Sequence, residues 1–228
     1  MHEHTIHAVD TALAYHPRMQ ALNISLFQWL AAGNTPHPQL LWLESVIAEG
    51  ASWGCVAIMG WVAWRLPSQR AYAVGTLVAA GVAALTAHAL ADAINLSRPF
   101  ALGLSPAHIV HGARGSLPSA HASVMFTVAL IFCMRPALRL AGLAMFAIAL
   151  VTGWARVYVG VHFPFDIVAG LLLAAAITAV FWLLVRWSQR FILRRLARDG
   201  AEIAAAQPTD PAKPGAAPLE ARAAVRHA

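Results

Sequence analysis

Long apolar runs separated by short polar segments dominate the chain and predict membrane-spanning helices. The runs cover residues 40–66, 71–96, 121–134, 138–158 and 165–187. Most of them reach or approach the roughly 20 residues that an α-helix needs to cross a bilayer, whereas 121–134 is short and would have to borrow residues at both ends. A further apolar stretch at 19–32 is either an interfacial helix or a short sixth crossing. We favour the crossing, because it would place Arg18 on the same side as most other arginines.

Composition supports the same class of protein. Of the 228 residues, 59% are hydrophobic and 11% are charged, and a soluble domain of this size cannot bury that much apolar surface. We therefore expect an all-α, polytopic membrane helix bundle of five to six transmembrane helices. The expected parts are an N-terminal amphipathic or short membrane helix (1–38), a transmembrane core (39–187), and a basic extension with a disordered tail (188–228), since the last 22 residues are rich in Ala and Pro.

The arginines predict how the bundle is oriented. They follow the first, third and fifth apolar runs as Arg65 and Arg70, Arg135 and Arg139, and Arg186, Arg190, Arg194, Arg195 and Arg198. Alternating crossings place all these segments on one side, which the positive-inside rule makes cytoplasmic. The net charge of +6 therefore indicates membrane topology, with the basic extension along anionic headgroups, and no nucleic-acid partner is expected.

Three polar islands, at 97–99, 118–121 and 156–166, fall on the opposite side. Ionisable groups beside hydrocarbon are costly, so they favour a functional interpretation. Arg98 and Arg156 provide planar, permanently charged forks that suit bidentate contact with phosphate. Ser119 and the backbone amides of Ala120 and His121 begin a predicted helix, where donors point toward an anion. The islands together predict a phosphate site.

The histidines of the islands supply a reaction. An imidazole can attack phosphorus to form a covalent intermediate, and His162 is the better candidate because Asp166, four residues on, can orient its ring and stabilise its positive charge. His121 would then be the general acid that protonates the leaving oxygen. This chemistry needs no metal and no cofactor, and we expect neither.

In these islands the chain resembles the type 2 phosphatidic acid phosphatases, a superfamily that includes vanadium haloperoxidases. The family signature is Lys-x6-Arg-Pro, then Pro-Ser-Gly-His, then Ser-Arg-x5-His-x3-Asp. The matching residues are Arg98 and Pro99, then Pro118, Ser119, Ala120 and His121, then Arg156, His162 and Asp166. The resemblance implies a haloperoxidase-like helical core, with His162 as nucleophile, Asp166 as its partner, His121 as acid, and the remaining polar residues on the phosphate.

The chain departs from this signature at three positions. Ala91 stands in place of the lysine, Ala120 in place of the glycine, and Ala155 in place of the serine. Loss of the lysine removes one phosphate contact and affects affinity or substrate choice more than reaction type. Asp92 and His88, one turn apart, either orient Arg98 or a water beside the site, or form a hydrogen bond between helices.

Two loop histidines, His108 and His111, and Arg114 precede the second island. They are either contacts to a diphosphate or solvated loop residues. The stretches 23–34, 97–100, 117–127 and 156–170 are most similar to BcrC-type undecaprenyl-diphosphate phosphatases, a branch that can also lack the lysine. That resemblance implies an isoprenoid lipid diphosphate as substrate, the bacterial inner membrane, a site facing the periplasm and a cytoplasmic C-terminus. Phosphatidate, phosphatidylglycerophosphate or lipid A phosphatases, and a lipid transporter or scramblase, are the alternatives; the oligomeric state is not predicted.

Overall fold

Helices make up every regular element in the part of the chain that the structure describes. The computed structural model describes residues 17–113 and 115–206, so the expected tail at 207–228 and Arg114 lie outside it. The helices are α2 (Pro17–Leu30), α3 (Pro38–Gly50), α4 (Ser52–Arg65), α5 (Arg70–Ile94), α6 (Ala120–Cys133), α7 (Arg139–Tyr158) and α8 (Pro164–Ala206). Three short 3₁₀ turns, η1 (Pro67–Gln69), η2 (Phe100–Leu102) and η3 (Pro136–Leu138), connect them. The all-α expectation is confirmed.

Proline and left-handed residues set the helix boundaries. Pro38 is in the first turn of α3, and Pro164 begins α8, where a missing N–H costs nothing and the fixed φ suits a helix. At the other end of α5, Asn95 adopts a φ of 48° and its N–H donates to the carbonyl of Ala91, as in left-handed C-terminal caps. Proline and a left-handed residue therefore mark where these helices begin and end.

The helices divide by length into spans and shorter pieces. Three are long and apolar enough to cross a membrane, namely Pro67–Ile94, Pro136–Tyr158 and Pro164–Asp199. The apolar run at 40–66, expected as one helix, is two helices, α3 and α4, bent by 46° at the break between them. If this pair counts as one broken span, the described residues hold four candidate spans in place of the five or six expected.

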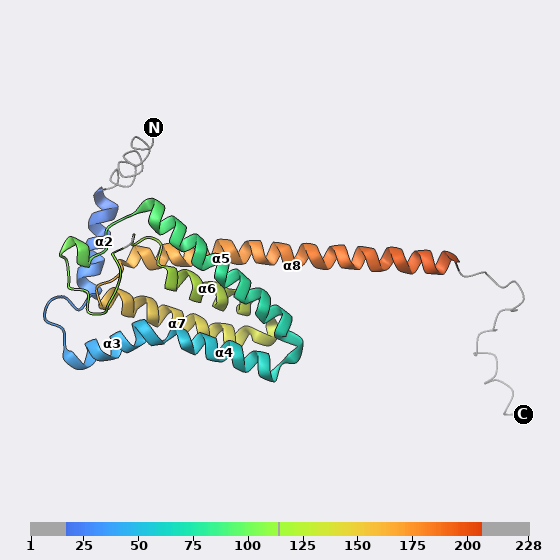
Figure 1. The fold of residues 1–228 in the computed structure, drawn as a ribbon, viewed down its shortest axis with the longest axis horizontal. Helices are drawn as coiled ribbons and strands as arrows, with labels where there is room; N and C mark the ends of the chain where they lie inside the picture. The colour runs from blue at the N-terminus through green and yellow to red at the C-terminus, as the bar shows by residue number, and fades with distance from the viewer. Residues whose placement is uncertain (1–16, 114, 207–228) are drawn as a thin grey trace, which may run out of the picture. The chain divides into compact units, whose positions relative to one another are not determined.

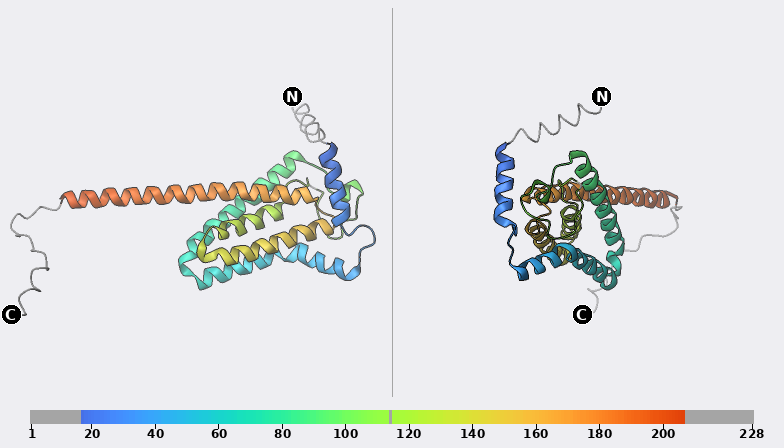
Figure 2. Two further views of the ribbon diagram at one scale, coloured as in Figure 1. Left: turned by 180° about the vertical axis from the view of Figure 1, so that it is seen from behind. Right: turned by 60° about the vertical axis from the view of Figure 1, so that its left-hand side comes forward.

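Central burial explains why α6 is shorter than a span. Its 14 residues extend about 21 Å, and the helix does not borrow residues at its ends, because Ser119 is its N-cap and a 3₁₀ turn follows at Pro136–Leu138. It packs between α5 and α7 and also contacts α4 (Figures 1 and 2). Most of its side chains are buried, including Phe126, Ile131 and Phe132. α2, which we favoured as a sixth crossing, is a 14-residue helix that contacts α7.

Small residues hold the neighbouring helices close to α6. A Cβ on Gly142 of α7 would lie 2.5 Å from the backbone nitrogen of Cys133, and one on Gly170 of α8 would lie 3.0 Å from the carbonyl oxygen of Ser119. Close backbone approach of this kind is how helices associate where both lipid and protein are apolar. The start of α6 is thereby fixed against the first turns of α8.

The helix α8 continues to Ala206, and its residues from 184 onward form a unit of their own. This unit includes the expected basic extension, whose arginines are exposed. Arg198 and Glu202, one turn apart, form a surface ion pair at 3.5 Å.

Candidate active site

The three polar islands meet at one end of the bundle, around a cavity of about 440 Å³. Arg98 comes from the loop after α5, His121 from the first turn of α6, Arg156 from the last turn of α7 and His162 from the connection to α8. Ala120 also lines the cavity. Helix ends at one face of the bundle therefore bring residues 64 positions apart into contact, since Arg98 hydrogen-bonds His162.

Asp166 holds the ring of His162 and caps α8 at once. The Nδ1 of His162 lies 3.1 Å from the Oδ2 of Asp166, and both side chains are buried. The same oxygen accepts the backbone N–H of Phe163 at 2.8 Å, so a carboxylate in the first turn satisfies a donor preceding the helix and interacts favourably with the helix dipole. The expected pairing of His162 with Asp166 is present in the structure.

Ser116 is a third donor to Asp166 that the sequence analysis missed. Its hydroxyl, which is buried, donates a short hydrogen bond to the same Oδ2. The backbone N–H of Ser119 donates to the carbonyl of Asp166 at 3.1 Å, which fastens the second island to the third. A serine two residues before the Pro118–His121 island was the only signal in the sequence, and nothing in its spacing distinguished it.

The surroundings of His162 favour its neutral form, and its Nε2 lies beside Arg98 at the cavity. The pKa of His162 is lowered to about 4: burial is the largest cause, Arg156 and Arg98 also lower it, and the hydrogen bond and charge of Asp166 oppose them. With the proton on Nδ1 toward Asp166, Nε2 keeps its lone pair. Arg98 donates to this Nε2 from Nη1 at 3.2 Å, which agrees with an acceptor there because a guanidinium only donates. A neutral imidazole is the nucleophilic form once this lone pair is released.

Arg98 is held beside His162 by backbone carbonyls. Its Nη1 donates to Val161 at 2.9 Å and its Nη2 donates to Gly115 at 3.1 Å. Burial lowers the pKa of Arg98, and the charge of Asp166 raises it. The loop can approach the end of α5 this closely because residue 115 is glycine. A Cβ at this position would collide with the backbone of Ala91.

Two buried polar atoms in this region have no hydrogen-bond partner among the described residues. They are Nε of Arg156 and Oγ of Ser119. Arg156 is anchored through Nη1, which donates to the carbonyl of Ala48 at 3.1 Å. A buried donor without a partner costs free energy, so the Nε of Arg156 suits an anion in the cavity. Ser119, expected on the phosphate, is fully buried and is not among the residues that line the cavity.

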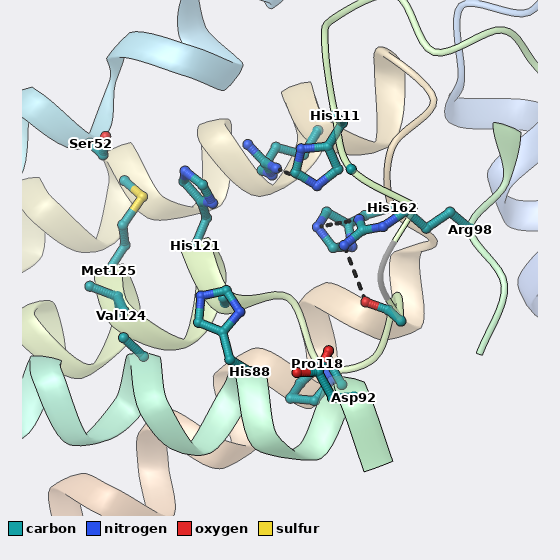
Figure 3. A pocket seen from close by; sticks show the side chains of 16 residues that line it. Ser52, His88, Asp92, Arg98, His111, Pro118, His121, Val124, Met125 and His162 are labelled. Carbon is teal, nitrogen blue, oxygen red and sulfur yellow. Dashed lines mark hydrogen bonds between the residues drawn. The ribbon is translucent and has the colours of Figure 1, made fainter. Parts of the chain in front are cut away.

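His121 faces His162 across the cavity (Figure 3). On α5, Asp92 and His88 line the cavity together with Ala91, which stands where the family has lysine. The apolar side chains of Ala84, Val124 and Met125 complete the wall. The cavity thus combines a polar end with an apolar flank. The α5 side contributes no lysine or arginine to the polar end, and its basic side chain there is His88.

The two loop histidines differ in position. His108 lies away from the cavity, with Nε2 at 2.9 Å from the carbonyl of Gly33. His111 lines the cavity, and its ring meets that of His162 edge-on with centroids 5.9 Å apart. Among the described residues, no three His, Cys, Asp or Glu side chains group as metal ligands.

Comparisons with known proteins agree on one family. A family model described as the PAP2 superfamily matches residues 72–190. "Putative undecaprenyl-diphosphatase YbjG" of Escherichia coli (strain K12) is 32% identical over 156 residues, which are 68% of this chain and 78% of that protein. Two solved structures match at 20% identity and a TM-score of 0.58, and so share the fold. LpxE of Aquifex aeolicus aligns over 71% of this chain and 94% of its own, and a PAP2 type phosphatidylglycerolphosphate phosphatase from Bacillus subtilis over 82% and 93%.

Proposed function

Because the chain belongs to the PAP2 superfamily and is a membrane lipid phosphatase, we propose that it removes the terminal phosphate of undecaprenyl diphosphate. The products are undecaprenyl phosphate and inorganic phosphate. The observation that carries this choice of substrate is the 32% identity, over 68% of the chain, to "Putative undecaprenyl-diphosphatase YbjG". The cavity supports it, since its polar end suits phosphate and its apolar flank suits an isoprenoid chain.

Phosphate binding is the first step. The guanidinium groups of Arg98 and Arg156 hold the equatorial oxygens of the terminal phosphate by charge-assisted hydrogen bonds. The start of α6, with the backbone N–H groups of Ala120 and His121, adds neutral donors at a helix N-terminus. Arg98 gives up its hydrogen bond to Nε2 of His162 when it turns to the phosphate, which uncovers the lone pair.

The first chemical step forms a covalent intermediate. Nε2 of His162 attacks the terminal phosphorus, the bond from phosphorus to the bridging oxygen breaks, and His121 on the opposite side of the cavity donates its proton to that oxygen. Undecaprenyl phosphate leaves. The positive charge that develops on the imidazole is stabilised by Asp166 through the Nδ1–H hydrogen bond.

The second step returns the protein to its starting state. His121, now neutral, takes a proton from water as the water oxygen attacks phosphorus. The bond between Nε2 and phosphorus breaks, phosphate leaves, and His162 is again neutral. His88 and Asp92 orient the water or Arg98 from the α5 side of the cavity.

The location follows from the distribution of arginine. We propose the bacterial inner membrane, with the cavity on the periplasmic side and the C-terminus in the cytoplasm, because the basic segments gather at the opposite ends of the spans. A lipid transporter is disfavoured by the arrangement of the charged groups. They surround one cavity at one end of the bundle, whereas transporters place their sites near the midplane between two related halves.

Phosphate release by the purified protein tests these assignments. Undecaprenyl diphosphate, phosphatidate, phosphatidylglycerophosphate and lipid A are compared as substrates in detergent with EDTA present. We expect undecaprenyl diphosphate to be turned over fastest, EDTA to have no effect, and His162→Ala to be inactive and to form no phosphoenzyme. Equal turnover of all four lipids would remove the narrow substrate assignment, and activity in His162→Ala would remove the nucleophile.

A further inference from the structure

His111 is a polar side chain of the cavity that the proposed reaction does not use. It lies in the loop between η2 and α6, outside the three islands, and its ring reaches the cavity next to His162 (Figure 3). The side chain is half-buried. A loop residue whose ring lies beside the nucleophile is placed to contact the group that the nucleophile attacks.

A hydrogen bond links His111 to the phosphate site. Nη2 of Arg156 lies 3.4 Å from Nε2 of His111. Arginine only donates, so Nε2 accepts and the ring carries its single proton on Nδ1. His111 therefore accepts from Nη2 of Arg156, while the carbonyl of Ala48 accepts from Nη1.

The surroundings keep this ring neutral. Its neighbours that carry or gain charge are Arg98, Arg156, His162 and His121, with Asp166 behind His162 and with His88 and Asp92 on the α5 side of the cavity. The pKa of His111 is lowered to about 3, first by burial and then by Arg98, Arg156, His162 and His121 in that order. A phosphate bound among these groups would offset the repulsion from the two arginines.

We propose that His111 is a third phosphate ligand, which releases Arg156 and takes up a proton from solvent when phosphate binds. Nε2–H of the imidazolium then donates to a phosphoryl oxygen, and Nη2 of Arg156 turns its own N–H to the same phosphate. The acceptor of the structure thus becomes a donor, with one proton gained and no bond to phosphorus changed. The proton returns to solvent when phosphate leaves.

This inference rests on the proposed function only in that phosphate enters this cavity, and it is tested with inorganic phosphate, the product of every PAP2 substrate considered above. Titration calorimetry of the full chain in detergent, near pH 6.5 in buffers of different ionisation enthalpy, counts the protons taken up per phosphate bound. The matched pair is His111→Asn and His108→Asn. Asparagine keeps an acceptor and a donor but does not titrate, and His108 lies in the same loop away from the cavity.

We expect the wild-type protein and His108→Asn to take up about one proton more per phosphate than His111→Asn. We also expect His111→Asn to bind phosphate about tenfold or more weakly, the scale of one charge-assisted hydrogen bond, with that difference shrinking above pH 8. Equal proton counts in wild type and His111→Asn, or no phosphate binding by the wild type, overturn the proposal. Failure to hydrolyse lipids is a separate result, since the proton count does not depend on it.

If His111→Asn is unfolded, His111→Gln provides the same non-titrating amide on a longer side chain. If His111 only supports the loop, His111→Asn and His111→Gln should both bind phosphate more weakly at every pH. They should then take up as many protons per phosphate as the wild-type protein. That result contradicts the proposal.

Discussion

Ser116, whose hydroxyl donates to Asp166, gives the sharpest test of how this site is built. Ser116→Ala removes one of three donors to Oδ2 of Asp166, leaving the N–H of Phe163 at 2.8 Å and Nδ1 of His162 at 3.1 Å. A buried hydrogen bond to a charged group contributes about 1.5–3 kcal/mol, against about 0.5–1.5 kcal/mol for one between neutral groups. We therefore expect Ser116→Ala to lower the free energy of unfolding by about 1.5–3 kcal/mol. The looser carboxylate should also lower kcat by about tenfold, which corresponds to about 1.4 kcal/mol in the transition state.

Ser123→Ala is the matched control for this change. Ser123 is also buried, and its hydroxyl donates to a neutral acceptor, the carbonyl of Ser119, at 2.9 Å. Thermal unfolding in detergent and the rate of phosphoenzyme formation after rapid mixing are measured for both variants. Ser123→Ala should lose less stability and keep its rate of phosphorylation. If the two variants lose the same stability and the same rate, Ser116 does not act through the carboxylate and the reasoning is refuted.

Three further predictions follow from the same geometry. The pKa of His162, lowered to about 4, lies below its unfolded value of about 6.5. Between these pH values the unfolded chain binds more protons than the folded protein, so stability should fall as the pH drops from 6.5 toward 4. His162→Asn should flatten the plot of Tm against pH in this window. The acidic limb of kcat/KM for the wild-type protein should fall near pH 4, where His162 gains a proton and loses its nucleophilic lone pair; a midpoint near 6.5 would contradict the lowered pKa. Gly170→Ala should lower Tm, because its Cβ would lie 2.8 Å from that of Ala122, whereas Gly60→Ala, with no atom within 4 Å, should not; equal Tm values would contradict the close packing of α8 on α6.

The spacing of the islands predicts their convergence because each island adjoins a helix end. Arg98, His121, Arg156 and His162 all line one cavity, and alternation of the helices is sufficient to place such ends on one face. Ser119 is the exception, since its hydroxyl is buried behind the cavity lining. A residue at an N-cap lies where the loop enters the helix, and its direction depends on contacts from other segments, here the carbonyl of Asp166.

The number and length of the spans were less predictable than the site. The break between α3 and α4 falls at Ala51, between Gly50 and Ser52, and Gly and Ser near each other are a known cause of kinks, so a local signal existed inside the apolar run. For α6, uniform hydrophobicity fits a helix that is buried on all sides as well as one that faces lipid. Hydropathy cannot separate the two cases, since protein and lipid are equally apolar neighbours.

The sequence did not distinguish Ser116, and it left His111 open between a contact to a diphosphate and a solvated loop residue. Both lie in the loop before α6, where no helical or strand period relates one residue to the next, so their contacts depend on how the whole loop folds. Their positions change how the missing lysine is understood. Around the cavity, Arg98 and Arg156 are balanced by Asp92 and Asp166, so permanent charges leave no surplus for a phosphate. A histidine that gains its charge only with the phosphate provides that surplus when it is needed, and Ala91 on α5 then leaves the apolar flank of the cavity free for the lipid chain.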